Sequence, residues 1–489
     1  MTASARLASR AALAVGLMVS FYALALATVA VLLAIPVLLW TVAKGLLIKV
    51  GLFCLVGAYA ILKAIVPRPD RFEAPGPRLA TEDQPELFRE IRDLARRTGQ
   101  EEPKEVYLIP DVNAWVGQRG GIMGIGSRRV MGIGLPLLQT LTVAELRGVL
   151  AHEFGHFHGG DVAIGPWIYK TRAALVRTVV EVASHSKLLS QLFIWYGNLF
   201  FRITHGVSRH QEVLADRLAA EIVGTDTFAS GLRRTNSAGL AFAPYWQGAV
   251  APVLSAGFAP PLAAGFEAFM SNPAVASQLT EALKQQALHE KASPYDTHPP
   301  LADRLAALGV SRSNAPAAAG PPAVSLLRNL EALETALVSV LAKGKPHGPV
   351  GWDEVGDKVW LPMWRGYASK LERALAGVTP SSLPSLAWER VGRRFIGSSK
   401  GDAGEAGDFV VGVAIALVLS QAGFRVESYP GQRQTLVGHG ERVEVFGLRQ
   451  RLEDAAAAEA WREFCARTGI ADVDLGAACA RHEKSGAKA

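Results

Sequence analysis

Two long apolar runs dominate the first 66 residues of the chain. Residues 11–43 contain no charged side chain. In residues 45–66 the only charged side chains are those of Lys49 and Lys63. Each run reaches the roughly 20 residues that a membrane-spanning helix requires. A cleaved signal peptide is the competing interpretation, but its apolar core ends after about 7–15 residues. The pattern therefore predicts a transmembrane hairpin over residues 1–66.

The charges around these runs indicate how the hairpin is oriented. Basic residues precede it, follow it and occupy its short connection, and they are Arg6, Arg10, Lys44, Lys49, Arg68, Arg71 and Arg78. More of them lie at the two outer ends than in the connection. The positive-inside rule then places the N-terminus and everything after Val66 in the cytoplasm. We expect an integral protein of a bacterial-type inner or plasma membrane.

The polar and apolar positions after the hairpin predict a helical domain with a small mixed sheet. The expected elements are an amphipathic helix over 83–98, strands over 105–109, 113–117 and 128–134, and a helix over 142–160. Thr142 and Glu145 form the Thr-x-x-Glu pattern of a capping box, which marks the start of that last helix. The glycine-rich residues 120–126 lack dinucleotide-binding spacing and are interpreted as a turn between strands.

Residues 163–270 are harder to assign. One or two amphipathic helices are expected over 163–204 and another over 208–224. The apolar residues 188–201 are compatible both with the membrane surface and with a protein core. Residues 239–270 combine apolar side chains with Pro and Gly, which favours a cleft-lining loop or lid.

A change of composition at residues 311–324 predicts a linker, followed by a separate α/β accessory domain over 325–489. That domain shows strands near 425–429 and 442–446 and a helix near 454–467. After a break at 401–408, residues 409–421 form an apolar helix that is too short to cross a membrane and is expected to be buried. The predicted fold class is α+β and mainly helical, with one domain over residues 67–310 between the hairpin and the linker.

Composition excludes several classes of function. The net charge is +7, but no Lys/Arg block interleaves with aromatic residues, so nucleic-acid binding is not expected. The three cysteines, Cys54, Cys465 and Cys479, are too far apart in sequence for a metal-binding motif or a disulfide framework.

The clearest chemical signal is His-Glu-x-x-His at residues 152–156. On a helix, His152 and His156 project from the same face and can bind one zinc ion. Glu153 lies next to the first histidine, where its carboxylate can take a proton from the attacking water of a zinc peptidase. His158 is two residues beyond His156 and is expected to point away from this face.

A third protein ligand must come from elsewhere in the chain. A third histidine of the compact metzincin pattern would stand at position 162, which is Val162. Glu212 fits best, because Asp216 lies one helical turn further on and can hold a ligand histidine in its metal-binding tautomer. His205 and His210 remain alternatives by their chemistry.

In these residues the chain resembles the membrane-anchored gluzincin metallopeptidases of the HtpX and CAAX prenyl endopeptidase type. The zinc motif is followed after about fifty residues by Ser208–Asp216 (SRHQEVLAD). Asn113–Val116 (NAWV) resembles the family's strand beside the cleft, and Thr297–Leu308 (THPPLADRLAAL) resembles its C-terminal element. The resemblance covers about residues 67–308.

The resemblance implies a zincin-like peptidase domain that hydrolyses peptide bonds, in protein quality control or processing. It implies Zn²⁺ bound by His152, His156 and Glu212, with Glu153 as general base. Further residues implied to act are Asp216 behind the ligands, His298 and Arg304 in catalysis, and Asn113 and Ala114 in binding the substrate as an extended strand.

Two departures from the family limit what can be carried over. HtpX-like members have two further spans after the zinc helix, whereas residues 163–204 here contain several charges. The accessory domain has no counterpart in the family, and prenyl-peptide processing is not expected.

A membrane-tethered scaffold or binding protein with a structural zinc site is the alternative function. Natural substrate and oligomeric state are not encoded in these patterns.

Overall fold

The computed structural model describes residues 3–43, 48–66, 72–120, 127–157, 165–289, 298–310, 319–345, 347–397 and 399–486. The chain is mainly helical, with three small sheets. It divides into two compact units. Unit 1 comprises residues 1–238 and 283–330, and unit 2 comprises residues 239–282 and 331–489. This division does not follow the linker expected at 311–324.

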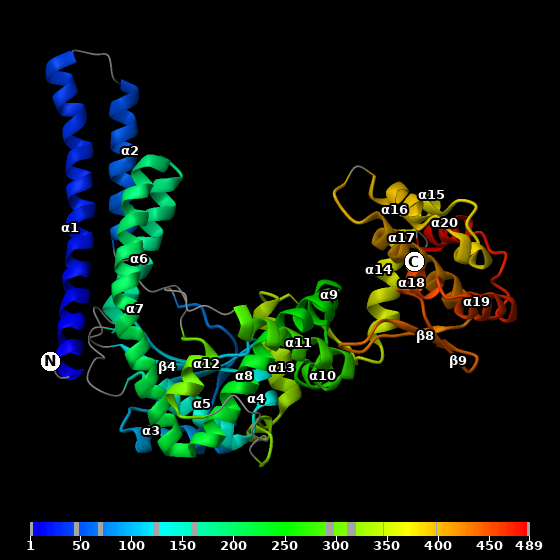
Figure 1. Cartoon of the computed structure of the whole chain (residues 1–489), viewed down its shortest axis with the longest axis horizontal. Coiled ribbons are helices and arrows are strands. Elements are labelled where there is room, and N and C mark those ends of the chain that lie inside the picture. Colours follow the sequence, from blue (N-terminus) through cyan, green and yellow to red (C-terminus); the bar gives the residue numbers. More distant parts are fainter. Residues whose placement is uncertain are drawn as a thin grey trace. The chain divides into compact units, whose positions relative to one another are not determined.

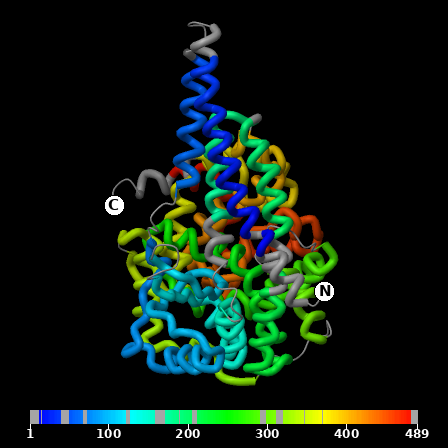
Figure 2. The backbone as a smooth tube through the Cα atoms, turned by 90° about the vertical axis from the view of Figure 1, so that its left-hand side faces the viewer, coloured from blue at the N-terminus to red at the C-terminus, as the bar shows by residue number. Residues whose placement is uncertain are grey.

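Four long helices of unit 1 pack together along their lengths (Figures 1 and 2). They are α1 (Ala3–Ala43), α2 (Ile48–Ile65), α6 (Gly165–Ala183) and α7 (Lys187–Val223). Their shared core includes Phe21, Ala25, Ile61, Leu175 and Phe193. Burial of these apolar side chains ties the α6–α7 hairpin to the N-terminal hairpin.

The outer faces of the four helices are also apolar. On α6 and the first part of α7 the exposed apolar side chains include Val176, Val180, Leu192, Trp195 and Leu199, and α1 and α2 expose many more. An apolar surface of this extent is unusual on a water-soluble protein and is typical of helices that contact lipid.

Two charged side chains of α6 interact with α2. Lys63 of α2 lies 3.1 Å from Glu181 of α6, and Arg177 donates a hydrogen bond of 3.3 Å to the backbone oxygen of Ala64. The predicted helix over 208–224 is not separate, because α7 continues without a break from Lys187 to Val223. One helix therefore joins the four-helix bundle to the residues around Glu212.

A four-stranded mixed sheet lies beside the peptidase helices. Its strands are β1 (Arg78–Leu79), β2 (Glu105–Ile109), β3 (Ala114–Arg119) and β4 (Arg128–Gly134), in the order β1-β2-β4-β3. β2 pairs with β4 in parallel and β3 pairs with β4 antiparallel. The three predicted strands are thus confirmed, and β3 forms one edge of the sheet.

The predicted helix over 142–160 is shorter than expected. After α3 (Pro85–Thr98) and α4 (Leu135–Thr140), α5 spans Val143–Gly155 and begins with the predicted capping box. His156 follows as its C-cap residue with helical φ and ψ of −62° and −16°. The i, i+4 relation to His152 is therefore preserved. The predicted turn at 121–126 lies outside the described residues.

Glu145 fixes α5 against the next helix, α8 (Thr225–Tyr245). Its buried carboxylate accepts hydrogen bonds from the Ser230 hydroxyl at 2.6 Å and from Arg234 at 2.8 Å. It also accepts the backbone N–H of Thr142 in the capping box. These hydrogen bonds hold the first turn of the zinc-motif helix against α8.

Gly155 allows α5 and α7 to approach closely. A Cβ at this position would lie 2.8 Å from the Cα of Ala215. We expect Gly155→Ala to cost about 1–3 kcal/mol by overpacking and to lower the apparent Tm by roughly 2–10 °C. Gly239 of α8 has open space around it, so Gly239→Ala should leave the Tm unchanged or raise it. Differential scanning calorimetry of both variants checks this; equal Tm values would contradict the packing argument.

Unit 1 is completed by two short elements, α12 (Leu301–Ala307) and the 3₁₀-helix η3 (Ala323–Leu326). The expected cleft-lining loop over 239–270 is instead mostly helical and belongs largely to unit 2. It contains the π-helix η2 (Trp246–Val250), α9 (Ala251–Ser255), β5 (Phe258–Ala259) and α10 (Leu262–Ser271).

The remaining elements lie mostly in unit 2, and those from η4 onward enclose a second core. They are α11 (Pro273–His289), α13 (Leu330–Leu341), β6 (Gly348–Pro349), η4 (Gly356–Trp360), α14 (Leu361–Arg365), α15 (Ala368–Leu375), η5 (Pro380–Ser385), α16 (Trp388–Ile396), α17 (Ala403–Gln421), β7 (Arg425–Glu427), β8 (Thr435–Gly438), β9 (Glu441–Glu444), α18 (Leu448–Arg451), α19 (Ala455–Arg467) and α20 (Leu475–Gly486). β7, β8 and β9 form an antiparallel sheet, of which β8 was not predicted.

The apolar helix α17 is the centre of that core. It begins at Ala403 rather than at residue 409, because the Asp402 side chain accepts the backbone N–H groups of Gly404 and Glu405. Within the described residues, α17 and Val15–Leu38 of α1 are both long and apolar enough to cross a membrane. However, 72% of the window in α17 is buried, against 22% in α1. α17 is therefore a core helix, as expected from the sequence.

Candidate metal centre

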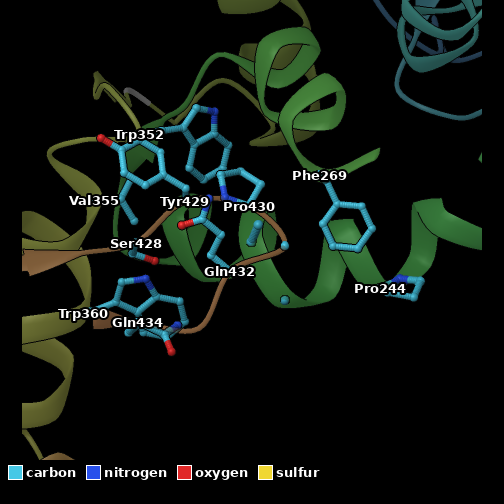
Figure 3. A pocket seen from close by; sticks show the side chains of 13 residues that line it. Pro244, Phe269, Trp352, Val355, Trp360, Ser428, Tyr429, Pro430, Gln432 and Gln434 are labelled. Atoms are coloured by element: carbon cyan, nitrogen blue, oxygen red, sulfur yellow. The ribbon is translucent and has the colours of Figure 1, made fainter. Parts of the chain in front are cut away.

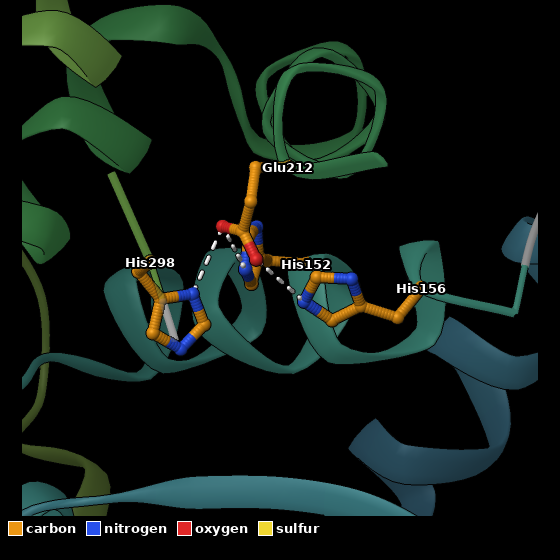
Figure 4. Close-up of side chains that lie close together, drawn as sticks. All are labelled: His152, His156, Glu212 and His298. Carbon is orange, nitrogen blue, oxygen red and sulfur yellow. Dashed lines mark hydrogen bonds and ion pairs between the residues drawn. The ribbon is translucent and has the colours of Figure 1, made fainter. Parts of the chain in front are cut away.

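Four potential metal ligands meet in unit 1. His152 comes from α5, His156 from its C-cap, Glu212 from α7, and His298 from the segment just before α12. One ligand atom from each lies within 4.8 Å of the others. Figure 4 shows Glu212 reaching from α7 toward the histidines, with dashed lines to all three.

His152 is held in the tautomer that suits a metal. Its Nδ1 lies 2.8 Å from Oδ1 of Asp216 and donates a hydrogen bond to it. Its Nε2 therefore keeps a free lone pair, and this buried atom has no hydrogen-bond partner. A buried polar atom without a partner is costly in a protein interior. A metal ion at Nε2 removes that cost.

The spacing of the ligand atoms fits a shared ion. Glu212 Oε2 lies 3.7 Å from His152 Nε2, and Glu212 Oε1 lies 3.6 Å from His156 Nε2. These distances are too long for hydrogen bonds. Two donors at about 2.1 Å from one tetrahedral zinc are about 3.4 Å apart. The three side chains thus have the chemistry and spacing of a zinc site.

Arg304 acts on this group of side chains through Asp216. Its Nε and Nη2 donate hydrogen bonds of 2.9 and 2.6 Å to the two carboxylate oxygens. Burial alone would raise the pKa of Asp216, but the hydrogen bonds from Arg304 and His152 outweigh it and hold that pKa at about 2. Asp216 is therefore ionised throughout the physiological range and continues to orient His152.

Removing Arg304 should weaken metal binding. Without the guanidinium, Asp216 loses two charge-assisted hydrogen bonds and holds His152 less firmly. We expect Arg304→Ala to reduce zinc affinity about 10–100-fold, measured by competition with a chelating dye. Arg217 is exposed on α7, next to Asp216, so Arg217→Ala is the matched control. Equal affinities for the two variants would show that Arg304 does not support the ligands.

His298 lies on the open side of the ligand group. Its Nδ1 donates a hydrogen bond of 2.9 Å to Glu212 Oε2, and its side chain is 43% exposed. This hydrogen bond raises the pKa of His298 above its usual value. Burial raises the pKa of Glu212, but the hydrogen bond from His298 together with electrostatic attraction to the three histidines lowers it overall. A protonated His298 is a hydrogen-bond donor beside the metal position.

The electrostatics around the two motif residues His156 and Glu153 suit their expected chemistry. Burial, with a smaller contribution from His152, lowers the pKa of His156 to about 4, so its imidazole is neutral at pH 7. Burial raises the pKa of Glu153, which interacts electrostatically with His152, His298 and Glu212. A carboxylate with a raised pKa is a stronger proton acceptor.

The edge strand β3 carries the two expected substrate-binding residues. Ala114 is its first residue and pairs with Ile133 of β4, while Asn113 is exposed immediately before it. Among the described residues β3 pairs with one strand alone, β4, and an extended peptide can pair with a strand edge of this kind.

One aromatic contact at the metal centre was not predicted from the sequence. The ring of Phe228 on α8 stacks on His152 with 6.1 Å between centroids. A phenylalanine within an amphipathic pattern predicts only a core position. His158 and Val162, and the side chains of His205 and His210, lie outside the described residues.

Comparison with known proteins points to the same type of peptidase. The model of Peptidase family M48 matches residues 81–311. Protease HtpX of Yersinia enterocolitica is 25% identical over 272 residues, covering 49% of this chain and 87% of the relative. Protease HtpX of Idiomarina loihiensis is 26% identical over 211 residues, covering 39% and 71%.

A third relative, the Protease HtpX homolog of a Sulfurihydrogenibium species, is 30% identical over 173 residues, covering 31% of this chain and 56% of the relative. No solved structure matches the chain. All three relatives are proteases, and the matched family region nearly coincides with the residues that carry the sequence motifs.

Proposed function

The chain is a membrane-associated metalloprotease of the HtpX type, with its M48 peptidase domain over residues 81–311, and from this premise we propose that His152, His156 and Glu212 bind its catalytic zinc. The single observation that carries the proposal is the buried Nε2 of His152, which has no partner. It lies 3.7 Å from one oxygen of Glu212, whose other oxygen lies 3.6 Å from His156 Nε2.

Glu153 performs the proton transfers in this proposal. When bound, zinc polarises the scissile carbonyl and makes water a nucleophile near neutral pH. Glu153 takes a proton from the attacking water and returns it to the leaving amine. Asp216 and Arg304 keep His152 in its binding orientation throughout.

His298 is proposed to stabilise the negative charge that develops on the carbonyl oxygen. Its raised pKa and its place on the open side of the ligand group support this role. Arg304 donates hydrogen bonds to both carboxylate oxygens of Asp216, and its Nη2 lies 3.3 Å from His152 Nδ1, so we assign it to positioning the ligands rather than to contacting substrate.

The substrate is proposed to bind as an extended strand along β3. Main-chain hydrogen bonds at an open sheet edge bind polypeptides with little dependence on their side chains. Asn113 and Ala114 mark the start of this edge. Such binding suits protein quality control or processing.

The domain arrangement is proposed as follows. Residues 1–66 form a transmembrane hairpin, residues 67–310 the zincin-like peptidase domain, and residues 325–489 an accessory α/β domain after a linker at 311–324. The exposed apolar side chains on α6 and α7 support placing this second hairpin in the membrane beside α1 and α2. The charge bias of the sequence places the peptidase domain in the cytoplasm.

This topology predicts a protease-protection pattern. In inverted inner-membrane vesicles the peptidase domain should be digested by added protease, because it faces outward. In right-side-out spheroplasts it should be protected until the membrane is permeabilised. A cytoplasmic marker enclosed in the spheroplasts controls for leakage. Protection in the inverted vesicles would overturn the cytoplasmic assignment.

Casein hydrolysis by the purified chain, with zinc content measured on the same sample, tests the proposed site. Chelation should remove one zinc ion per chain and stop cleavage together. A scaffold with a structural zinc would instead contain zinc and cleave nothing. Glu153 argues against that alternative, since a structural site has no use for a base beside the metal.

A further inference from the structure

The hairpin of α6 and α7 is shorter than the hairpin of α1 and α2 against which it packs (Figure 1). The Tyr196 hydroxyl of α7 donates a hydrogen bond of 2.5 Å to the backbone oxygen of Leu17 in α1. From Tyr196 back to Lys187, where α7 begins, the helix rises about 14 Å. From Leu17 to Leu38, where the apolar span of α1 ends, α1 rises about 32 Å. The shorter hairpin therefore covers about half of that span.

A contact with α2 places the tip of the shorter hairpin, residues 184–187, at the same depth. Gly57 lies at the middle of α2. A Cβ built on Gly57 would lie 4.0 Å from Cδ2 of Leu189, in the first turn of α7. The tip thus lies beside the middle of α2, at about half the depth of the transmembrane hairpin.

The halves of α1 and α2 that continue beyond the tip are apolar on their outer faces. Their exposed side chains include Leu33, Val37, Leu38, Leu52 and Phe53. If the tip lay at the far surface of the bilayer, these side chains would stand in water, which is unfavourable for so many apolar groups. The bilayer therefore extends past the tip.

The tip itself is polar. Ser184, His185 and Lys187 are exposed, and the Ser186 side chain accepts the backbone N–H of Leu189 as the N-cap of α7. An exposed ammonium group and an exposed imidazole are costly in hydrocarbon unless water or a polar partner reaches them. The tip is therefore expected to contact water within the bilayer.

A polar face of α6 connects the tip to the peptidase side of the bundle. Arg177, Glu181 and Ser184 follow one another at spacings of four and three residues, so they share this face. Lys63 of α2 lies 3.1 Å from Glu181, and 47% of its side chain is exposed. Because α2 ends at Ile65, this ion pair lies at the peptidase-side end of α2. The polar groups form a path from that side to the tip.

We propose that the α6–α7 hairpin is a re-entrant element, which enters the bilayer from the peptidase side, turns back near its midplane and contacts water along the polar face of α6. Its other surface, which includes Leu192 and Trp195, contacts lipid. A bilayer accommodates a short segment by local thinning, and polar side chains are tolerated where water fills the defect. The inference rests on the proposed placement of α1 and α2 in the membrane and is independent of the metal site.

The test is labelling of single added cysteines in the full chain with a sulfonated, membrane-impermeant maleimide. Ser184→Cys should be labelled in inverted inner-membrane vesicles and not in right-side-out spheroplasts. In the vesicles it should react at least about ten-fold faster than Val37→Cys on the lipid-facing part of α1, because a thiol reacts as its thiolate, which forms in water. The three native cysteines are buried, so the unmodified chain is the blank. A Tm equal to that of the wild type shows that Ser184→Cys is folded.

Two further positions report the sides of the membrane. Gly45→Cys, between α1 and α2 in the sequence, should be labelled only in spheroplasts. Gln432 is exposed beside the small pocket of unit 2 (Figure 3), and Gln432→Cys should be labelled only in inverted vesicles. Labelling of Ser184→Cys on the side of Gly45→Cys would show that the hairpin crosses the membrane and would overturn the proposal. Labelling on neither side would also overturn it, because water would not reach the tip.

The proposals fail separately. If Gly45→Cys and Gln432→Cys exchange sides, the cytoplasmic orientation is refuted, but labelling of Ser184→Cys together with Gln432→Cys still supports the re-entrant hairpin. If these two controls behave as expected and Ser184→Cys is labelled with Gly45→Cys or not at all, the re-entrant hairpin is refuted and the proposed function stands. Zinc content and casein hydrolysis test the metal site independently of both results.

Discussion

Glu153→Gln will abolish peptide hydrolysis and leave zinc bound. Glutamine is nearly isosteric with glutamate but does not accept the proton of the attacking water. Since general-base catalysis contributes about 10²–10⁴-fold, kcat/KM for a casein-derived peptide should fall by about three orders of magnitude. The ligands His152, His156 and Glu212 are unchanged, so mass spectrometry of the purified variant should still find one zinc ion per chain.

A matched control separates this effect from a general loss of acidic charge. Glu221 lies on α7 and is exposed, so Glu221→Gln makes the same chemical change away from the centre and should keep full activity. If a zinc-loaded Glu153→Gln variant still cleaves peptides, Glu153 is not the general base.

Glu212→Ala will remove the metal itself. The side chain supplies the only carboxylate in the ligand group, and alanine leaves two imidazoles that bind zinc weakly. Loss of an outer-shell partner costs about 10–100-fold in affinity, so loss of a direct ligand should cost more than 100-fold. The purified variant should contain little zinc and show no peptidase activity.

Thermal unfolding provides a readout for this variant that does not depend on catalysis. Zinc at 1,000 times its Kd stabilises a folded chain by about 4 kcal/mol, so added zinc should raise the Tm of the chelated wild type. The Tm of Glu212→Ala should not respond to zinc at the same concentration. His185 is exposed in the segment between α6 and α7, and a His185→Ala control should respond like the wild type. A full zinc-dependent Tm shift in Glu212→Ala would exclude Glu212 as a ligand.

Local sequence patterns were sufficient for β2, β3 and β4 and for the start of the zinc-motif helix. The short, largely apolar runs at residues 105–109 and 128–134 and the capping box at Thr142 depend on neighbours a few residues apart. The resemblance to HtpX-type peptidases is confirmed by the family match and the relatives. The end of α5 was not predicted, and the chain leaves the helix at His156 rather than at residue 160.

The packing of the second hairpin was not accessible from local patterns. Charges such as Glu181 made a membrane location for residues 163–204 doubtful, but Lys63 pairs with Glu181 in the folded bundle. The two residues are far apart in sequence, and neither predicts its partner. The same holds for Arg304, whose partner Asp216 lies 88 residues away.

The central claim is that one zinc ion in the His152–His156–Glu212 site makes this chain a peptidase. The most direct measurement is the rate of peptide cleavage by the chelated, purified chain as Zn²⁺ is added back in known amounts. The rate should start near zero, rise linearly and stop rising at one zinc ion per chain. Full cleavage before any zinc is added, or none at one equivalent of bound zinc, would contradict the claim.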